Sequence, residues 1–271
     1  MSIRVSVLIA LLSVLLVLAG LWVGANVDLL PLQASTNAPV YDELFQVLFS
    51  IGTMLFLGVL GLLIYTLVRF RRSSGDLGDG AATEGNLPLE IVWTAIPAVV
   101  VLFVGLYSYN IYERMGGMVP LSDHGAMHGM AVGEENGNAK VWAGIGAAPG
   151  LSPAVSVDVT AMQFAFIFRY PESNIVSGQL HVPEGQLVQL HMQANDVIHA
   201  FWVPQFRLKQ DIIPGQPTVL AFTASRPGTY PIICAELCGL YHGAMHTSIV
   251  VHGRESYEQW LTENTPPPVT A

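Results

Sequence analysis

The sequence has few charged side chains and very few cysteines. Only 11% of its 271 residues are charged, whereas 52% are apolar. A chain so poor in charge is not one ordinary soluble domain. Because its polar residues are unevenly spread, we expect a membrane part joined to a water-facing part. The two cysteines exclude a framework of several disulfides. They leave a single Cys234–Cys238 bridge or a metal site as alternatives.

The chain also lacks an excess of basic residues. Its net charge is −9, and the region from residue 118 onward has 12 acidic and 6 basic residues, a net charge of −6. An acidic region of this kind repels nucleic acid and anionic lipid and attracts a basic partner. The alternative is an acidic surface that only keeps the domain soluble. We therefore expect no nucleic-acid partner.

Three apolar runs occupy the first 110 residues. The first, Val5 to Val23, follows Arg4 and precedes small residues, so residues 1–25 are either a cleaved signal peptide or a retained signal anchor. The run contains no lipobox cysteine. The sequence alone does not decide between these two readings.

The second and third runs predict a two-helix transmembrane hairpin over residues 40–114. Leu44 to Val68 and Ile91 to Tyr107 are each close to the roughly 20 residues that cross a bilayer. An Arg-Phe-Arg-Arg cluster at 69–72 lies in the loop between them, and the positive-inside rule places this loop in the cytoplasm. Everything after Arg114 then lies on the opposite, periplasmic or lumenal face. The mature chain has two helices, or three if residues 1–25 are retained.

The third run begins with helix-start signals. Pro88 and Glu90 suit the first turn of a helix, where a missing N–H is harmless and negative charge favours the dipole. Pro97 should kink the same helix.

Residues 115–150 read as a flexible linker. Its His124, Met127, His128 and Met130 are either weak copper ligands or incidental side chains of a tether.

From residue 151 to 253 short alternating runs, such as Val155 to Val159, are separated by Pro/Gly turns. This pattern predicts an all-β sandwich or barrel. Residues 254–271 predict a short C-terminal helix and a disordered tail.

The segment from Cys234 to Met245 carries the clearest chemical signal. It holds both cysteines, a histidine and a methionine, and this mixture of soft and borderline ligands suits copper. One Cys, one His and one Met would describe a mononuclear site, but two thiolates can bridge two copper ions. The segment therefore predicts a binuclear electron-transfer centre.

A further nitrogen ligand is expected from outside this segment. His199 lies 35 residues before Cys234, which leaves room for a hairpin and a return strand that would bring the two together. We interpret His181, His191 and His252 as structural, because they sit in strand-like patterns without such partners. The side chain of His246 should point away from that of Met245.

Five ordered blocks then carry a family resemblance. They are Leu89 to Pro97, Asp196 to Pro204, Asp211 to Gly215, Ser225 to Tyr230 and Cys234 to Met245. The chain resembles subunit II of the haem-copper cytochrome c oxidases over nearly all its length. Within that family it most resembles bacterial members, those of cyanobacteria included. The resemblance implies a membrane α-hairpin plus an all-β cupredoxin-like Greek-key sandwich that holds the binuclear copper centre called CuA.

The resemblance also implies roles for individual residues. Cys234 and Cys238 bridge both coppers, and His199 and His242 each supply one nitrogen. Met245 supplies a sulfur to one copper, and the carbonyl oxygen of Glu236 weakly ligates the other. The Glu236 side chain reaches toward magnesium at the boundary with subunit I. Glu90 matches a glutamate at the start of a proton pathway, although a simple helix-start carboxylate explains it equally well.

The implied activity is that of a terminal oxidase. Single electrons pass from cytochrome c, or a similar soluble carrier, to CuA and then to haem in subunit I, where oxygen is reduced to water with proton pumping. Subunits I and III and membrane lipid are the implied partners.

One motif departs from the family. Met162 to Phe166 aligns with the family's Gln-Trp-aromatic-Trp strand, but both tryptophan positions are phenylalanine here, Phe164 and Phe166. In the family the first of these tryptophans commonly receives the electron. Phe164 is therefore either the electron-entry position or only a core or docking residue, and Tyr241 and Trp202 are alternative candidates.

Two other functions fit parts of the same sequence. Nitrous oxide reductases have a similar copper loop but lack the hairpin. A membrane-tethered cupredoxin that binds or delivers copper would need neither Glu90 nor helices packed against a partner. Small residues within 42–114 favour close helix contact and hence a subunit.

Overall fold

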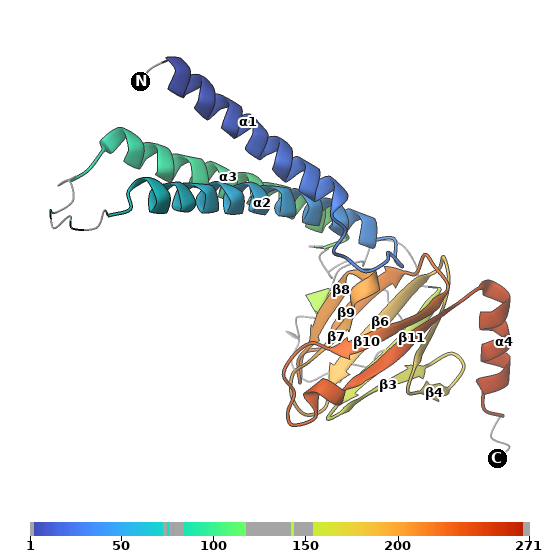
Figure 1. The fold of residues 1–271 in the computed structure, drawn as a ribbon. Helices are drawn as coiled ribbons and strands as arrows, with labels where there is room; N and C mark the ends of the chain where they lie inside the picture. Colours follow the sequence, from blue (N-terminus) through green and yellow to red (C-terminus); the bar gives the residue numbers. More distant parts are fainter. Residues whose placement is uncertain are drawn as a thin grey trace. The chain divides into compact units, whose positions relative to one another are not determined.

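The computed structural model describes residues 3–72, 75, 78, 84–117, 142–143 and 154–267 of the chain. These residues form two compact units (Figure 1). One comprises Met1–Leu29 and Asp42–Asn110, and the other comprises Leu30–Tyr41 and Ile111–Ala271. The predicted linker ligands His124, Met127, His128 and Met130 lie outside the described residues.

The first unit is helical. Its helices are α1 (Ile3–Asn26), α2 (Ala38–Arg69) and α3 (Leu87–Arg114). All three are long and apolar enough to cross a membrane. α2 and α3 correspond to the two runs that predicted the hairpin, and both extend beyond them. α3 runs through Pro97 as a single helix.

Helix α1 packs closely on α2 through two glycines. Gly20 and Gly24 are the buried residues of α1. A Cβ atom on Gly24 would collide with the Ser50 side chain and lie 2.8 Å from the Gln46 carbonyl oxygen. A Cβ atom on Gly20 would collide with Met54. This spacing of four is the small-residue arrangement that brings helix backbones together in membranes.

The start of α3 is held by reciprocal side-chain hydrogen bonds. The Leu89 N–H donates to Asn86 Oδ1 at 3.2 Å, and the Asn86 N–H donates to Glu90 Oε1 at 3.1 Å. This is a capping arrangement that satisfies backbone donors the helix leaves unpaired. Glu90 therefore has a local structural role.

The second unit is a sandwich of two sheets. The six-stranded sheet has the order β1-β9-β6-β2-β3-β4 and the five-stranded sheet the order β5-β11-β10-β7-β8. The first sheet consists of β1 (Trp142–Ala143), β2 (Val155–Met162), β3 (Ala165–Tyr170), β4 (Ile175–Ser177), β6 (Leu187–Ala194) and β9 (Thr218–Thr223). The second consists of β5 (Leu180–Pro183), β7 (His199–Val203), β8 (Leu208–Ile212), β10 (Gly228–Cys234) and β11 (His246–His252).

Alternation along the strands builds the core between the sheets. β2 alternates buried and half-buried residues along its whole length, so Val155, Val157 and Val159 face inward as the sequence pattern predicted. Phe166 and Phe168 of β3 are also buried. β1 lies within the predicted linker and pairs in parallel with β9. A C-terminal helix, α4 (Arg254–Asn264), covers part of the predicted tail segment.

A short stretch before α2 belongs to the sandwich, which the predicted boundaries of 151–253 did not anticipate. Ser35 pairs with Ala224 as an isolated β-bridge, and its hydroxyl donates to the Phe206 carbonyl at 2.9 Å. The Ala34 N–H donates to the Gln205 carbonyl at 3.0 Å. We call residues 34–37 the N-terminal strap.

Candidate metal site

The pairing of two strands brings His199 to the cysteine segment. β7 and β10 are antiparallel neighbours, with Phe201 opposite Cys234 and Trp202 opposite Ile233. His199 therefore begins the strand beside the one that ends at Cys234. A hairpin and a return through the other sheet separate them in the chain, as the 35-residue spacing predicted.

The loop from Cys234 to Met245 is closed by backbone hydrogen bonds. The Cys234 N–H donates to the Met245 carbonyl at 3.1 Å, and the Met245 N–H donates to the His242 carbonyl at 3.1 Å. The Ala235 N–H donates to the Ala200 carbonyl of β7 at 3.2 Å. These bonds fix both ends of the loop to the five-stranded sheet.

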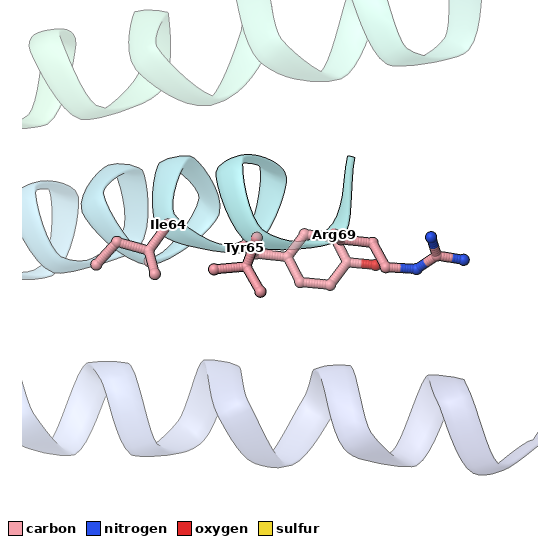
Figure 2. A pocket seen from close by; sticks show the side chains of 5 residues that line it. Ile64, Tyr65 and Arg69 are labelled. Atoms are coloured by element: carbon pink, nitrogen blue, oxygen red, sulfur yellow. The ribbon is translucent and has the colours of Figure 1, made fainter. Parts of the chain in front are cut away.

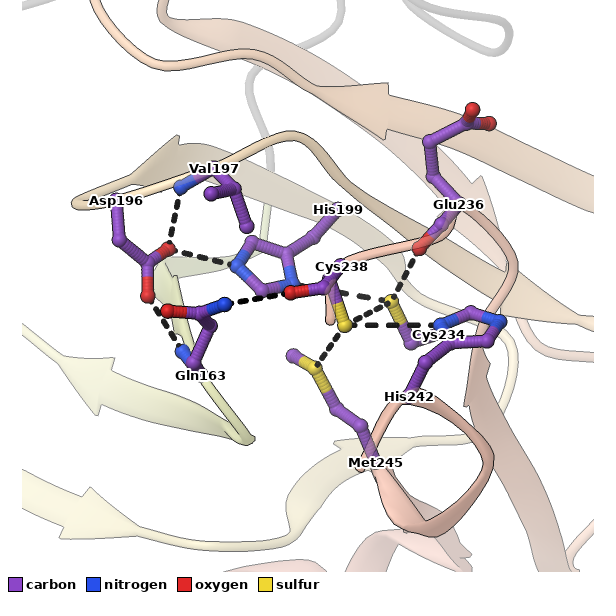
Figure 3. Close-up of polar contacts among 9 residues, drawn as sticks. All are labelled: Gln163, Asp196, Val197, His199, Cys234, Glu236, Cys238, His242 and Met245. Carbon is purple, nitrogen blue, oxygen red and sulfur yellow. Dashed lines mark hydrogen bonds and ion pairs between the residues drawn. The ribbon is translucent and has the colours of Figure 1, made fainter. Parts of the chain in front are cut away.

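The side chains of the predicted ligand set converge inside this loop (Figure 3). The Cys234 and Cys238 sulfurs are 3.8 Å apart. His199 Nδ1 lies 3.8 Å from Cys234 Sγ, and His242 Nδ1 lies 3.6 Å from Cys238 Sγ. Met245 Sδ is 3.6 Å from Cys238 Sγ. Five sulfur and nitrogen atoms thus face one small volume.

The same loop also presents a main-chain oxygen. The Glu236 carbonyl is 3.4 Å from Cys234 Sγ. All six residues predicted as metal ligands are therefore brought together.

The inner side of the site is buried. His199 is fully buried, and Cys234, Cys238 and Met245 are each no more than 3% exposed. His242 is half-buried and completes the site toward its outer side. Burial and the adjacent Cys234 thiol raise the pKa of Cys238 to about 11. A metal that binds here must therefore displace a proton from this thiol.

Asp196, which was not predicted as a functional residue, orients His199. Its Oδ1 lies 2.8 Å from His199 Nε2, so the carboxylate favours the tautomer with the proton on Nε2 and leaves Nδ1 free for a metal. Desolvation acts to raise the pKa of Asp196, but hydrogen bonds from His199, Gln163 and Val197 outweigh it and lower that pKa. The sequence signal for Asp196 is its position three residues before His199.

The donor set fits copper and does not fit a disulfide. Both cysteines are free, and a sulfur separation of 3.8 Å is far longer than the S–S bond of about 2.05 Å. Two sulfurs at this separation can both contact one metal ion at a thiolate bond length of about 2.3 Å. Two thiolates, two imidazoles and a thioether form a soft to borderline set, which is the preference of copper.

The Glu236 side chain does not by itself form a magnesium site. Its Oε2 lies 3.7 Å from Lys209 Nζ, and Lys209 also pairs with Asp211 at 2.8 Å. An ammonium group supplies no ligand to magnesium, so the ion would need oxygen ligands from another subunit. The magnesium assignment stays a prediction.

The aromatic candidates for electron transfer surround the loop. Phe164 is half-buried, and its ring meets that of Tyr241 edge-on with centroids 5.4 Å apart. Tyr241 is 59% exposed and adjoins His242 in the chain. Trp202 lies on β7 and is 37% exposed.

One open cavity lies away from these residues, on α2. It has a volume of about 490 Å³ and is lined by Gly61, Ile64, Tyr65, Val68 and Arg69 (Figure 2). These residues lie in a helix apolar enough to span a membrane and offer no cluster of metal ligands.

Comparison with known proteins gives the family. Residues 20–111 match the model for the cytochrome c oxidase subunit II transmembrane domain, and residues 169–253 match the model for its periplasmic domain. Cytochrome c oxidase subunit 2 of Thermostichus vulcanus is 51% identical over 274 residues, which cover 93% of this chain and 83% of that protein. The chain belongs to the cytochrome c oxidase subunit 2 family.

Other relatives have the same name. Subunit 2 of a Synechocystis species is 45% identical over 99% of this chain and 85% of its own length. Among solved structures, the chain is similar to the periplasmic domain of subunit II of cytochrome oxidase from Bradyrhizobium japonicum, with 25% sequence identity. The structural match covers 42% of this chain and 95% of that domain's chain, with a TM-score of 0.40.

Membership in this family decides between the three functions that fit the sequence: oxidase subunit, membrane-tethered cupredoxin and nitrous oxide reductase. The transmembrane match covers both helices of the hairpin, so this is an oxidase subunit and not a free-standing tether or a nitrous oxide reductase. The subunit 2 family also gives the chain a membrane part and a periplasmic cupredoxin-like domain. The predicted family and fold class are thereby confirmed, with cyanobacterial relatives.

Proposed function

We propose that this subunit accepts single electrons from cytochrome c, or a similar soluble carrier, at a binuclear CuA centre. It passes them to haem in subunit I, where oxygen is reduced to water with proton pumping. The observation that carries this proposal is the pair of buried thiols with sulfurs 3.8 Å apart, flanked by His199, His242 and Met245.

Each ligand has a specific task in this proposal. Cys234 and Cys238 would hold the two copper ions through their thiolates, and His199 and His242 would each offer an imidazole Nδ1. Met245 Sδ and the Glu236 carbonyl oxygen would supply the weaker ligands. When bound, copper supplies one-electron redox chemistry at a site from which water is excluded.

The protein keeps these ligands nearly stationary during electron transfer. The backbone bonds that close the loop hold both cysteines, and Asp196 holds the His199 ring. Ligands fixed in advance need little rearrangement between the two oxidation states, which favours rapid transfer. Tyr241 is the exposed aromatic residue adjacent in sequence to a ligand, so it is our candidate for the surface position where electrons arrive.

The remaining assignments follow the family. We propose subunits I and III as partners in the membrane and a copper domain on the periplasmic or lumenal face. Glu90 is proposed at the start of a proton pathway, in addition to its role in capping α3.

Copper analysis with electron paramagnetic resonance tests the proposal. The full chain, purified in detergent, should bind two coppers and share one unpaired electron between them. Cys238→Ser should leave at most a mononuclear site, because one bridge is lost. One copper per wild-type chain with a mononuclear signal would contradict the proposal. Co-purification with a haem-bearing partner tests the subunit assignment separately.

A further inference from the structure

Gln163 lies between the two segments that carry the proposed ligands (Figure 3). It occupies the turn between β2 and β3. Its backbone N–H donates to Asp196 Oδ2 at 2.6 Å, and Asp196 in turn holds His199. Its side-chain Nε2 donates to the Cys238 carbonyl at 2.6 Å. One residue therefore contacts both the support of a histidine and the backbone of a cysteine.

A glycine in the loop from Cys234 to Met245, which we call the copper loop, allows this turn to lie close to it. Gly239 follows Cys238 and has φ +133°, in the region that L side chains rarely adopt. A Cβ atom on Gly239 would lie 2.8 Å from Gln163 Nε2 and 3.3 Å from two ring carbons of Phe164. A larger residue would thus displace the Gln163 amide from the carbonyl it binds.

The contact also joins the two sheets. β2 and β3 belong to the six-stranded sheet, whereas His199 and Cys234 lie on strands of the five-stranded sheet. The backbone bonds described above tie the ligand loop only to its own sheet. The Gln163 bonds add a support from the opposite sheet.

We propose that Gln163 is a positioning residue that holds His199, through Asp196, and Cys238, through its carbonyl, in one fixed arrangement. This inference rests on the proposed function, because it assumes that both residues bind copper. Residues that orient metal ligands typically change metal affinity by about 10- to 100-fold when they are replaced. Gln163 touches no metal and acts only through these neighbours.

The first experiment compares two glutamine substitutions in the copper-loaded full chain. Gln163→Met keeps the side-chain length but removes the N–H donor. Gln179→Met is the control, because Gln179 also donates a side-chain hydrogen bond, at 2.7 Å, but donates it to Ser248 Oγ, which is not one of the proposed copper ligands. In competition with a copper chelator we expect Gln163→Met to lose affinity by about 10-fold and the control to match wild type. The copper hyperfine pattern should change only in Gln163→Met.

Two further variants separate positioning from general stability. Gln163→Lys restores a side-chain N–H donor and should retain more copper than Gln163→Met. Asp196→Ala combined with Gln163→Met should lose less affinity than the product of the two single losses, because both act on one unit. Thermal unfolding of each metal-free protein is measured in parallel.

The outcomes are distinct. Wild-type affinity and an unchanged hyperfine pattern in Gln163→Met would overturn the inference while leaving the copper site intact. So would multiplicative losses in the double variant, or a loss that follows a lower melting temperature and is not rescued by Gln163→Lys. Failure of the wild-type chain to bind copper through its cysteines would instead overturn the proposed function.

Discussion

At the scale of single residues, the conformation of Gly239 sets how near the β2–β3 turn can lie to the copper loop. Its φ of +133° is strained for any residue with a side chain, and a methyl group there would lie 2.8 Å from Gln163 Nε2, so the Gln163 side chain would have to move. Gly243, in the same loop, has no atom within 4 Å of where its Cβ would stand. A side chain would therefore be accommodated at Gly243 but not without rearrangement at Gly239, although the two glycines look equivalent in the sequence.

Gly239→Ala should destabilise the fold, and Gly243→Ala is its control. We expect a loss of about 1–3 kcal/mol for Gly239→Ala, which is typical of a residue forced into a rarely populated backbone region. Gly243→Ala should stay within about 0.5 kcal/mol of wild type. Urea unfolding of both variants in detergent measures the difference. Equal stability of the two would show that the loop relaxes around the added methyl.

Ligand chemistry could be read from the sequence, whereas ligand support could not. Cysteine, histidine and methionine can be recognised in the sequence as metal ligands, because copper prefers these residue types and they lie close together in the chain. Gln163 and Asp196 are ordinary polar residues, and their effect depends on contacts 33 and 75 residues away in the chain. Only the folded geometry shows which backbone groups they bind.

At the scale of elements, α1 is more than an apolar run. Its Gly20 and Gly24 are buried against α2, where the Ser50 and Gln46 region of that helix leaves no space for a side chain. A segment that is removed after export has no need of a fitted contact with a later helix. This packing favours α1 as a retained third span.

Replacing Gly24 should separate the two helices. Gly24→Leu is expected to reduce cross-linking between cysteines introduced at Leu16 and Gly58, because a Cβ on Gly58 would lie 3.4 Å from Leu16 Cδ2 in the packed pair. Gly61→Leu is the control, since nothing lies within 4 Å of its Cβ position. N-terminal sequencing should find α1 in the purified subunit. A mature chain that begins after residue 25 would refute its retention.

The helices and strands themselves were accessible to sequence reasoning, because hydropathy and alternation are local signals. The N-terminal strap was not. Residues 34–37 are small and polar and show no strand pattern, and the groups they pair with lie 171 or more residues away. Long-range pairing of this kind leaves no trace in a local window.

At the scale of the whole molecule, a histidine pair links stability to pH. His181 Nδ1 lies 2.9 Å from His252 Nε2, and the His181 ring stacks on Trp260 of α4 with centroids 4.3 Å apart. Burial, with a smaller contribution from His252, lowers the pKa of His181 from 6.5 to about 4. Burial also lowers the pKa of His252. The folded state therefore keeps this pair neutral where an unfolded chain would be protonated.

The free energy of unfolding should accordingly fall between pH 6.5 and about 4. In that interval the unfolded state binds more protons, so stability is fully present above pH 6.5 and is lost as the pH falls toward 4. For one proton the slope stays below about 1.4 kcal/mol per pH unit, and partial exposure of His181 reduces it further. His181→Phe should flatten the profile. Urea unfolding across this pH range measures it, and an unchanged slope in His181→Phe would refute the assignment.

The strap has a practical consequence for preparing a soluble copper domain. A truncated protein that begins after α3 would expose Ala224 and leave the Phe206 and Gln205 carbonyls without the donors they have in the full chain. Unpaired buried carbonyls cost about 1–3 kcal/mol each. Joining residues 30–37 to such a fragment through a designed linker, or supplying them as a separate peptide, should recover this loss. The sandwich is thus completed by a short piece of chain that precedes α2 in the sequence.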